Sequence, residues 1–141
     1  MKILLVEDSR TIRLEMERTL IRAGYDVVCA ENGEQALEKT TVDLPDLILL
    51  DLLMPGIGGL ETLLQLKQNR ATKEIPVVIL SSLSERNHDK LIQAGAEDYF
   101  EKGQVVPEKG KNHLPALLQN VIARINRRRG HLQLAIPLPR Q

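Results

Sequence analysis

Short runs of consecutive apolar residues constrain the fold of this chain more than any other feature. Within these runs, polar residues do not alternate with the apolar ones. Ile3–Val6, Leu47–Leu50 and Val77–Leu80 are apolar throughout. Strands of this kind are typical of a parallel sheet that is covered by helices on both faces. Two further runs, Val27–Ala30 and Asp98–Phe100, are expected to be strands as well, which makes a sheet of five.

Helical patterns separate the apolar runs. Ile12, Met16 and Leu20 recur on one face of a helix that Ser9 can cap and Gly24 can end. Four more helices are expected on the same grounds, around Ala36–Leu37, Leu60–Leu64, Leu91–Ile92 and Leu117–Ile125. Strands that alternate with helices predict a doubly wound α/β fold, in which right-handed crossovers place helices on both faces of the sheet.

The 141 residues are enough for one domain with a substantial core. We expect this domain to cover residues 1–127. Residues 128–141 are expected to be a tail or the start of a linker, because Pro137 and Pro139 lie in a segment without helical period. The polar stretch Gly103–His113 is expected to be a loop.

Charge and composition exclude several classes of function. Lys and Arg number 19, as do Asp and Glu, so the formal net charge is zero and no long-range field for nucleic acid is expected. Arg127–Arg129 suits a helix C-terminus, where cations offset the helix dipole. No apolar stretch is long enough to span a membrane. The single cysteine and the absence of a signal-peptide pattern favour a cytoplasmic location.

Carboxylates follow two of the apolar runs. Asp51 ends the run Leu47–Leu50, and Glu7 and Asp8 directly follow Ile3–Val6. The ends of parallel strands meet at one edge of a sheet, where ligands bind in folds of this type. Three carboxylates at that edge repel one another unless a cation or protons neutralise them. The pattern therefore indicates a divalent metal site and a reactive aspartate.

Four segments together carry a resemblance to a known family. They occur in this order: Ile3-Leu4-Leu5-Val6-Glu7-Asp8, Asp51-Leu52-Leu53-Met54-Pro55, Ile79-Leu80-Ser81-Ser82 and Ala94-Gly95-Ala96-Glu97-Asp98-Tyr99-Phe100-Glu101-Lys102. From residue 2 to about residue 127 the chain resembles the receiver domain of two-component response regulators. The resemblance implies a flavodoxin-like, five-stranded parallel sheet of order 2-1-3-4-5.

The resemblance also implies a phosphorylation site. Asp51 corresponds to the phosphoacceptor. Asp8, Glu7, Asp51 and the backbone carbonyl of Leu53 correspond to the groups that hold Mg²⁺. Lys102 corresponds to the lysine that contacts the acceptor aspartate and its phosphoryl group. Carboxylate attack on phosphorus forms an acyl phosphate, and Mg²⁺ prefers such oxygen ligands.

A switch and its partners follow from the same resemblance. Ser81 corresponds to the residue that senses the phosphoryl group, and Tyr99 to the aromatic residue that responds. The phosphoryl donor would be a histidine kinase or a histidine phosphotransfer protein. The output would be a downstream protein or a fused output domain, with a homodimer as a further option. The protein would modify itself without turning over a metabolite, so it is not expected to be an enzyme.

Two other classes compete with this interpretation. An aspartyl-phosphate phosphohydrolase on a related α/β sheet commonly needs a second acid two residues after the nucleophile, where this chain has Leu53. A flavin-binding module needs a phosphate loop after the first strand, where Glu7 and Asp8 would repel phosphate. Within the receiver interpretation, Ser82 and Lys109 are local alternatives to Ser81 and Lys102.

The chain departs from the family pattern after Lys102. Gly103 stands where receivers usually have proline, and the loop that follows is longer than usual. Leu53 and Leu83 occupy two positions near the phosphorylation site that vary widely in the family. Both are apolar and can hinder an attacking water, so we expect a phosphoryl group on Asp51 to be long-lived.

Overall fold

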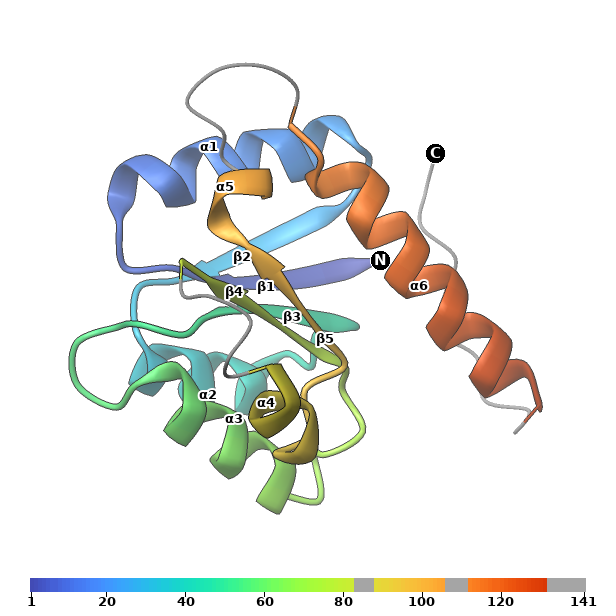
Figure 1. Cartoon of the computed structure of the whole chain (residues 1–141). Helices are drawn as coiled ribbons and strands as arrows, with labels where there is room; N and C mark the ends of the chain where they lie inside the picture. The colour runs from blue at the N-terminus through green and yellow to red at the C-terminus, as the bar shows by residue number, and fades with distance from the viewer. Residues whose placement is uncertain (83–87, 106–111, 132–141) are drawn as a thin grey trace.

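The fold is a five-stranded parallel sheet covered by helices on both faces (Figure 1). The computed structural model describes residues 1–82, 88–105 and 112–131. The strands are β1 (Lys2–Val6), β2 (Asp26–Ala30), β3 (Leu47–Asp51), β4 (Val77–Ser81) and β5 (Asp98–Glu101). Their order in the sheet is β2-β1-β3-β4-β5, and every neighbouring pair is parallel. The predicted fold class and strand order are therefore confirmed.

Each strand is longer than predicted by one residue. The additional residue precedes the apolar run in β1 and β2 and follows it in the other three strands. As a result, Asp51 and Ser81 are the last residues of β3 and β4. In the parallel register Asp51 lies opposite Leu80, so Ser81 lies one residue beyond Asp51 along the sheet. We call the side on which the strands end the carboxyl edge, and the side on which they begin the amino edge.

Six helices lie among the described residues: α1 (Arg10–Arg22), α2 (Gly33–Val42), α3 (Gly59–Gln68), α4 (His88–Gln93), α5 (Lys102–Val105) and α6 (Leu114–His131). Side-chain caps begin the first two. Ser9 accepts a hydrogen bond from the Ile12 N–H at 3.4 Å, and Asn32 accepts one from the Gln35 N–H at 2.8 Å. Such caps satisfy N–H groups that have no partner within the helix.

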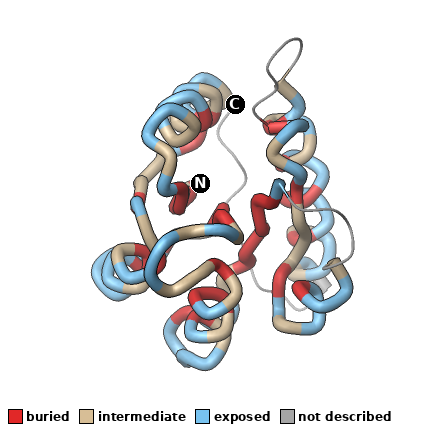
Figure 2. The backbone as a smooth tube through the Cα atoms, turned by 60° about the vertical axis from the view of Figure 1, so that its left-hand side comes forward, coloured by how far each residue is buried: buried red, intermediate tan, exposed pale blue. Residues whose placement is uncertain are grey.

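Alternate residues of the strands form two apolar cores, one on each face of the sheet. Ile3, Leu5, Leu47 and Leu49 pack with residues of α1 and α6. Their neighbours in the strands pack with α2, α3 and α4 on the opposite face. Figure 1 shows these two helix layers, and Figure 2 shows that the buried residues run through the centre of the molecule. The double burial explains why the strands contain no polar alternation.

The segment after Lys102 differs from the prediction. Gly103–His113 was expected to be a loop, but Gly103–Val105 belongs to the short helix α5. Val105 is fully buried in the core with Leu114 and Leu118, and this apolar contact fixes the helical turn. A side chain at Gly103 would meet open space, so crowding does not require glycine there. Residues 106–111, including Lys109, lie outside the described residues.

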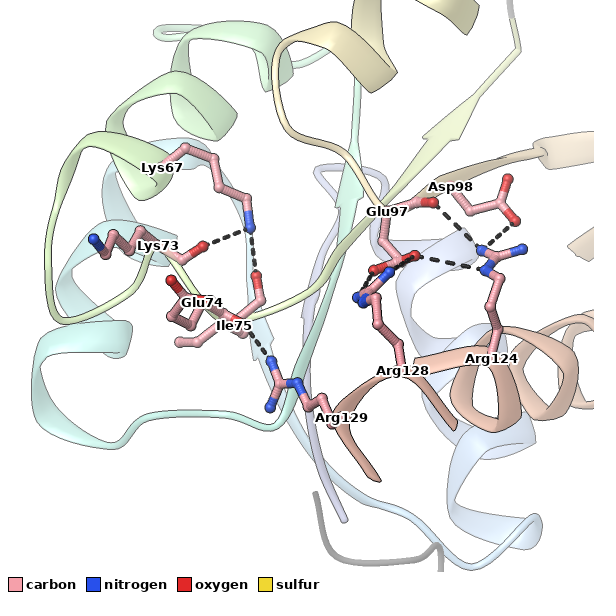
Figure 3. Close-up of polar contacts among 9 residues, drawn as sticks. All are labelled: Lys67, Lys73, Glu74, Ile75, Glu97, Asp98, Arg124, Arg128 and Arg129. Atoms are coloured by element: carbon pink, nitrogen blue, oxygen red, sulfur yellow. Dashed lines mark hydrogen bonds and ion pairs between the residues drawn. The ribbon is translucent and has the colours of Figure 1, made fainter. Parts of the chain in front are cut away.

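Helix α6 continues beyond the predicted domain boundary at residue 127 and ends at His131. The sequence after Ile125 has no apolar residue until Leu132, so the hydrophobic pattern does not predict this extension, although Arg127–Arg129 were expected at a helix C-terminus. Polar contacts hold it instead. Arg128 pairs with Glu97, and Arg129 donates to the Glu74 carbonyl (Figure 3). The remainder of the predicted tail, residues 132–141, lies outside the described residues. Among the helices described, none has the length and apolar character needed to cross a bilayer.

Candidate phosphoacceptor site

The ends of four strands place polar side chains at the carboxyl edge. Glu7 follows β1, Asp51 ends β3, Ser81 ends β4, and Lys102 directly follows β5. Backbone hydrogen bonds hold these positions. The Glu7 N–H donates to the Ala30 carbonyl at 3.1 Å, which continues the ladder between β1 and β2. The sheet therefore brings together residues that are far apart in the sequence.

Glu7, Asp8 and Asp51 form an acid cluster. Each offers one carboxylate oxygen, and these three oxygens lie within 4.8 Å of one another. Asp51 is 1% exposed and Glu7 is fully buried, whereas Asp8 is exposed to solvent. Two buried carboxylates beside a third acid need a positive charge or a proton to be stable. The three acids that the sequence singled out thus meet in one place.

Lys102 supplies one positive charge to this cluster. Its Nζ lies 2.9 Å from Glu7 Oε1, as an ion pair without the alignment of a hydrogen bond, and 3.1 Å from Asp51 Oδ1. Burial lowers the pKa of Lys102, but its pairing with Glu7 and Asp51 outweighs burial, so the pKa lies above its ordinary value. One ammonium group does not balance the two buried carboxylates.

The negative charge that Lys102 does not offset affects the pKa of Asp51. Burial and the neighbouring Glu7 carboxylate raise the pKa of Asp51 to about 7, although Lys102 opposes the increase. Asp51 Oδ1 has Lys102 as a partner and lies 3.4 Å from the Leu53 N–H. Asp51 Oδ2 is buried and has no hydrogen-bond partner in the described part of the chain. A buried oxygen of this kind, beside two further acids, fits a divalent cation with oxygen ligands.

The backbone around Asp51 is held firmly. The Leu52 N–H donates to the Leu80 carbonyl at 2.9 Å, and the Gly59 N–H donates to the Leu52 carbonyl at 2.9 Å. A Cβ at Gly59 would lie 2.4 Å from the Asp51 carbonyl oxygen, so only glycine lets α3 begin this close to the end of β3. The Leu53 side chain is 55% exposed. Its carbonyl remains a predicted metal ligand.

Ser81 and Tyr99 lie on the neighbouring strands β4 and β5, with Ser81 at the carboxyl edge and Tyr99 two residues before the end of its strand. Ser81 is buried, whereas the next residue, Ser82, is exposed. Tyr99 lies opposite Ile79 in the sheet and packs against the core that faces α2, α3 and α4. Strand alternation places Ser81 on the same face as Ile79. The switch roles of Ser81 and Tyr99 remain predictions, and Leu83 lies outside the described residues.

Sequence reasoning missed two residues that contact this site. The His88 ring lies with its centroid 4.4 Å from that of Tyr99, at an interplanar angle of 51°. Arg13 donates from Nη1 to the Glu7 carbonyl at 2.9 Å. The position of Arg13 one turn after the Ser9 cap, facing back toward the end of β1, is a signal that could have indicated this contact.

A parallel sheet of order 2-1-3-4-5, with an acid cluster and a lysine at its carboxyl edge, defines a receiver-like α/β domain. A sequence model of the response regulator receiver domain matches residues 3–110. The chain therefore belongs to the receiver domain family of response regulators. This membership does not favour the phosphohydrolase alternative.

Curated relatives agree with this family. The chain is 39% identical over 103 residues to the alkaline phosphatase synthesis transcriptional regulatory protein PhoP of Bacillus subtilis, with 72% of this chain and 42% of that protein covered. It is 36% identical over 128 residues to the response regulator MprA of Mycobacterium leprae, with coverages of 89% and 49%. The chain thus spans about half the length of these relatives or less.

Solved structures agree as well. The BeF3-activated N-terminal receiver domain of RstA from Klebsiella pneumoniae is 31% identical and superposes with a TM-score of 0.74, over 86% of this chain and 98% of that one. A putative response regulator from Chloroflexus aurantiacus is 30% identical, with a TM-score of 0.75 over 87% and 98% of the two chains. Both the fold and the family are therefore established.

Proposed function

We propose that this chain is a phosphorylation switch in which Asp51 accepts a phosphoryl group. The observation that carries the proposal is the buried Asp51 carboxylate, which has one oxygen paired with Lys102 and the other without a partner among the described residues. A structural carboxylate would have both oxygens satisfied. The donor would be phosphohistidine on a histidine kinase or on a histidine phosphotransfer protein.

Mg²⁺ is the proposed cofactor. The acids Asp8, Glu7 and Asp51, together with the Leu53 carbonyl, would hold it, because this ion prefers oxygen ligands and few carboxylates. When bound, the ion would neutralise charge on the transferring phosphoryl oxygens and separate the acids electrostatically. The small gap between the carboxylate oxygens, within 4.8 Å, supports this assignment.

The residues of the chain would perform the transfer itself. A carboxylate oxygen of Asp51 would attack phosphorus in line with the leaving nitrogen. The O–P bond would form while the P–N bond breaks, and the departing imidazole would keep the electron pair and take up a proton. Lys102, already within 3.1 Å of Asp51, would offset the negative charge on the phosphoryl group. This is self-modification rather than turnover of a metabolite.

Ser81 and Tyr99 would report the phosphoryl group to partners. The Ser81 hydroxyl can donate a hydrogen bond to a phosphoryl oxygen, and this bond exists only after transfer, so it would favour one of two conformations. The Tyr99 ring, on the same face of the sheet, would move inward as Ser81 shifts. Because the His88 ring contacts the Tyr99 ring at a tilted angle, this movement would have to alter the contact between the two rings.

The output is proposed to act through protein contacts, with a downstream protein, a fused output domain or a second copy of the chain. The chain spans half the length of its curated relatives or less, so an output domain beyond it is compatible with the family. Direct binding of nucleic acid is not proposed, since Arg128 and Arg129 are engaged within the domain. A cytoplasmic location remains part of the proposal.

Incubation with Mg²⁺ and acetyl phosphate, followed by intact-mass measurement, tests the proposal. We expect the addition of one phosphoryl group, lost when Mg²⁺ is chelated beforehand and lost in Asp51→Asn. Asp89→Asn, which changes an exposed aspartate on α4, is the matched control and should label normally. Labelling that persists in Asp51→Asn would show that another residue is the acceptor.

The lifetime of the phosphoryl group is a second property of the proposed site. Leu53 lies two residues after Asp51, and its exposed apolar side chain can hinder water at the carboxyl edge. We expect Leu53→Asn to lose phosphate faster than the natural protein, because an amide can orient an attacking water. Mass measurements over time after removal of acetyl phosphate give both rates. Equal rates would contradict a role for Leu53.

A further inference from the structure

Arg13 is a charged side chain in an unusual position. It lies on the first turn and a half of α1, yet its side chain is only 13% exposed. Its guanidinium group turns back toward β1, where Nη1 donates to the Glu7 carbonyl at 2.9 Å and also lies 3.4 Å from the Asp8 carbonyl. On its other side, Nη2 lies 3.5 Å from Glu31 Oε1, directly after β2.

The two carbonyls that Arg13 contacts belong to the peptide groups on either side of Asp8. Peptide groups are planar, so holding both carbonyls fixes the rotation of the backbone about the Asp8 Cα. The direction of the Asp8 Cα–Cβ bond, along which the side chain leaves the backbone, is then fixed as well. Asp8 is the exposed member of the acid cluster, so the core does not hold its side chain as it holds Glu7.

Glu7 has different supports. Its Oε2 accepts a hydrogen bond from the Ser9 N–H at 3.1 Å, and its Oε1 pairs with Lys102. The two neighbouring acids are therefore positioned by different means. Glu7 is held through its carboxylate, whereas Asp8 is held through its backbone by Arg13.

We propose that Arg13 is a positioning residue for the metal site, which fixes the backbone on both sides of Asp8 so that its side chain already starts toward the acid cluster when the cation binds. This inference rests on the proposed Mg²⁺-dependent function. The planar guanidinium can reach two carbonyls from one side chain, whereas a lysine ammonium acts as a point charge on a flexible stem. Glu31 steadies the far side of the guanidinium group.

Residues that orient metal ligands from outside typically change metal affinity by about 10-fold to 100-fold when they are removed. We expect Arg13→Ala to weaken Mg²⁺ binding by about 10-fold. Arg13→Lys keeps the charge but loses the two-carbonyl contact, so it should weaken binding nearly as much. Glu31→Gln keeps both carbonyl contacts and should weaken binding by no more than about 3-fold. Arg10→Ala removes an exposed arginine from the same helix and should leave the affinity unchanged.

The test is a Mg²⁺ titration of the 141-residue chain and these four variants, followed by amide chemical shifts and by the rise of the melting temperature with Mg²⁺ concentration. A ligand that binds the folded state raises stability according to its affinity, so the two readouts report the same constant. A purely structural role for Arg13 would lower the melting temperature without Mg²⁺ and leave the affinity intact.

The outcomes separate this inference from the proposed function. An Arg13→Ala protein that folds and binds Mg²⁺ within twofold of the natural chain would overturn the inference. If Arg13→Ala does not fold, the Arg13→Lys variant provides the test. An unchanged Mg²⁺ affinity in that variant would overturn the proposal that Arg13 acts by contacting both carbonyls. Failure of the natural chain itself to bind Mg²⁺ would overturn the proposed function, and the inference with it.

Discussion

The two edges of the sheet use charged residues in opposite ways. At the carboxyl edge, Lys102 pairs with the buried acids Glu7 and Asp51. Among the residues that the structure describes, Asp51 Oδ2 has no hydrogen-bond partner. At the amino edge, half-exposed arginines of α6 face acids that precede or begin β5 (Figure 3). Arg128 contacts both oxygens of Glu97, at 2.6 and 3.2 Å.

At the amino edge, backbone carbonyl groups also have hydrogen-bond partners. Lys67 donates from Nζ to the Ile75 carbonyl at 2.7 Å and to the Lys73 carbonyl at 3.0 Å, and Arg124 donates to Asp98 Oδ2 at 3.1 Å (Figure 3). These completed pairs hold α3 and α6 against the segments where the strands begin. The comparison teaches that charge alone does not mark a functional site in this protein. The candidate site differs from the amino edge in that its acids are buried and their pairing is incomplete.

Removal of Lys102 should have the largest effect on stability. Lys102→Met leaves Glu7 and Asp51 buried without their cation, and breaking a buried pair from one side costs about 3 kcal/mol. We expect a loss of about that size in urea unfolding at pH 8 without Mg²⁺. Lys90→Met, on an exposed position of α4, is the control. A loss no larger than that of the control would mean that the carboxyl edge is not electrostatically unbalanced.

Removal of the Asp51 charge should act in the opposite direction. The pKa of Asp51 rises from 3.8 to about 7 on folding, so the folded state holds the proton more tightly and stability falls as pH rises through this window. Asp51→Asn should therefore be more stable than the natural chain at pH 8 without Mg²⁺, by an amount of the same order as the loss expected for Lys102→Met. The difference should shrink toward zero at pH 4. A destabilised Asp51→Asn at pH 8 would contradict the comparison.

A smaller effect is expected at the amino edge. Glu97→Gln removes the partner of Arg128 and Arg124, whose side chains are about half exposed, so the cost should be about 1 kcal/mol or less. Because salt screens exposed pairs, the loss should decrease further in 1 M NaCl, a concentration at which the Debye length is about 3 Å. Glu38→Gln on α2 is the matched control. A loss of stability in Glu97→Gln that does not change with salt would mean that these ion pairs behave as buried charges do.

Local sequence patterns predicted the sheet because its strands are buried on both faces. Each apolar run marks a strand to within one residue, and Ser9 marks the start of α1. The acid cluster could be predicted for a related reason. Parallel strands end on the same side, so Glu7 and Asp51 meet wherever the neighbouring strands are β1 and β3.

Features that depend on contacts distant in the sequence could not be predicted. The last turns of α6 have no apolar stripe, and their pairing with Glu97 depends on how the helix crosses the start of β5. The burial of Val105 depends on the same helix, and a single valine in a polar stretch carries no periodic signal. The contact of Arg13 with the Glu7 carbonyl could not be predicted, because every residue has a backbone carbonyl and the sequence does not indicate which one accepts a hydrogen bond.

Identification of the modified residue is the decisive test of Asp51 as the phosphoacceptor. Borohydride reduces an acyl phosphate to an alcohol, so a phosphorylated aspartate becomes homoserine and can be located by peptide mass mapping. After incubation with Mg²⁺ and acetyl phosphate, we expect this conversion at Asp51, with Glu7 and Asp8 unchanged. Conversion at Glu7 or Asp8 instead, or a protein that gains phosphate without any conversion at Asp51, would contradict it.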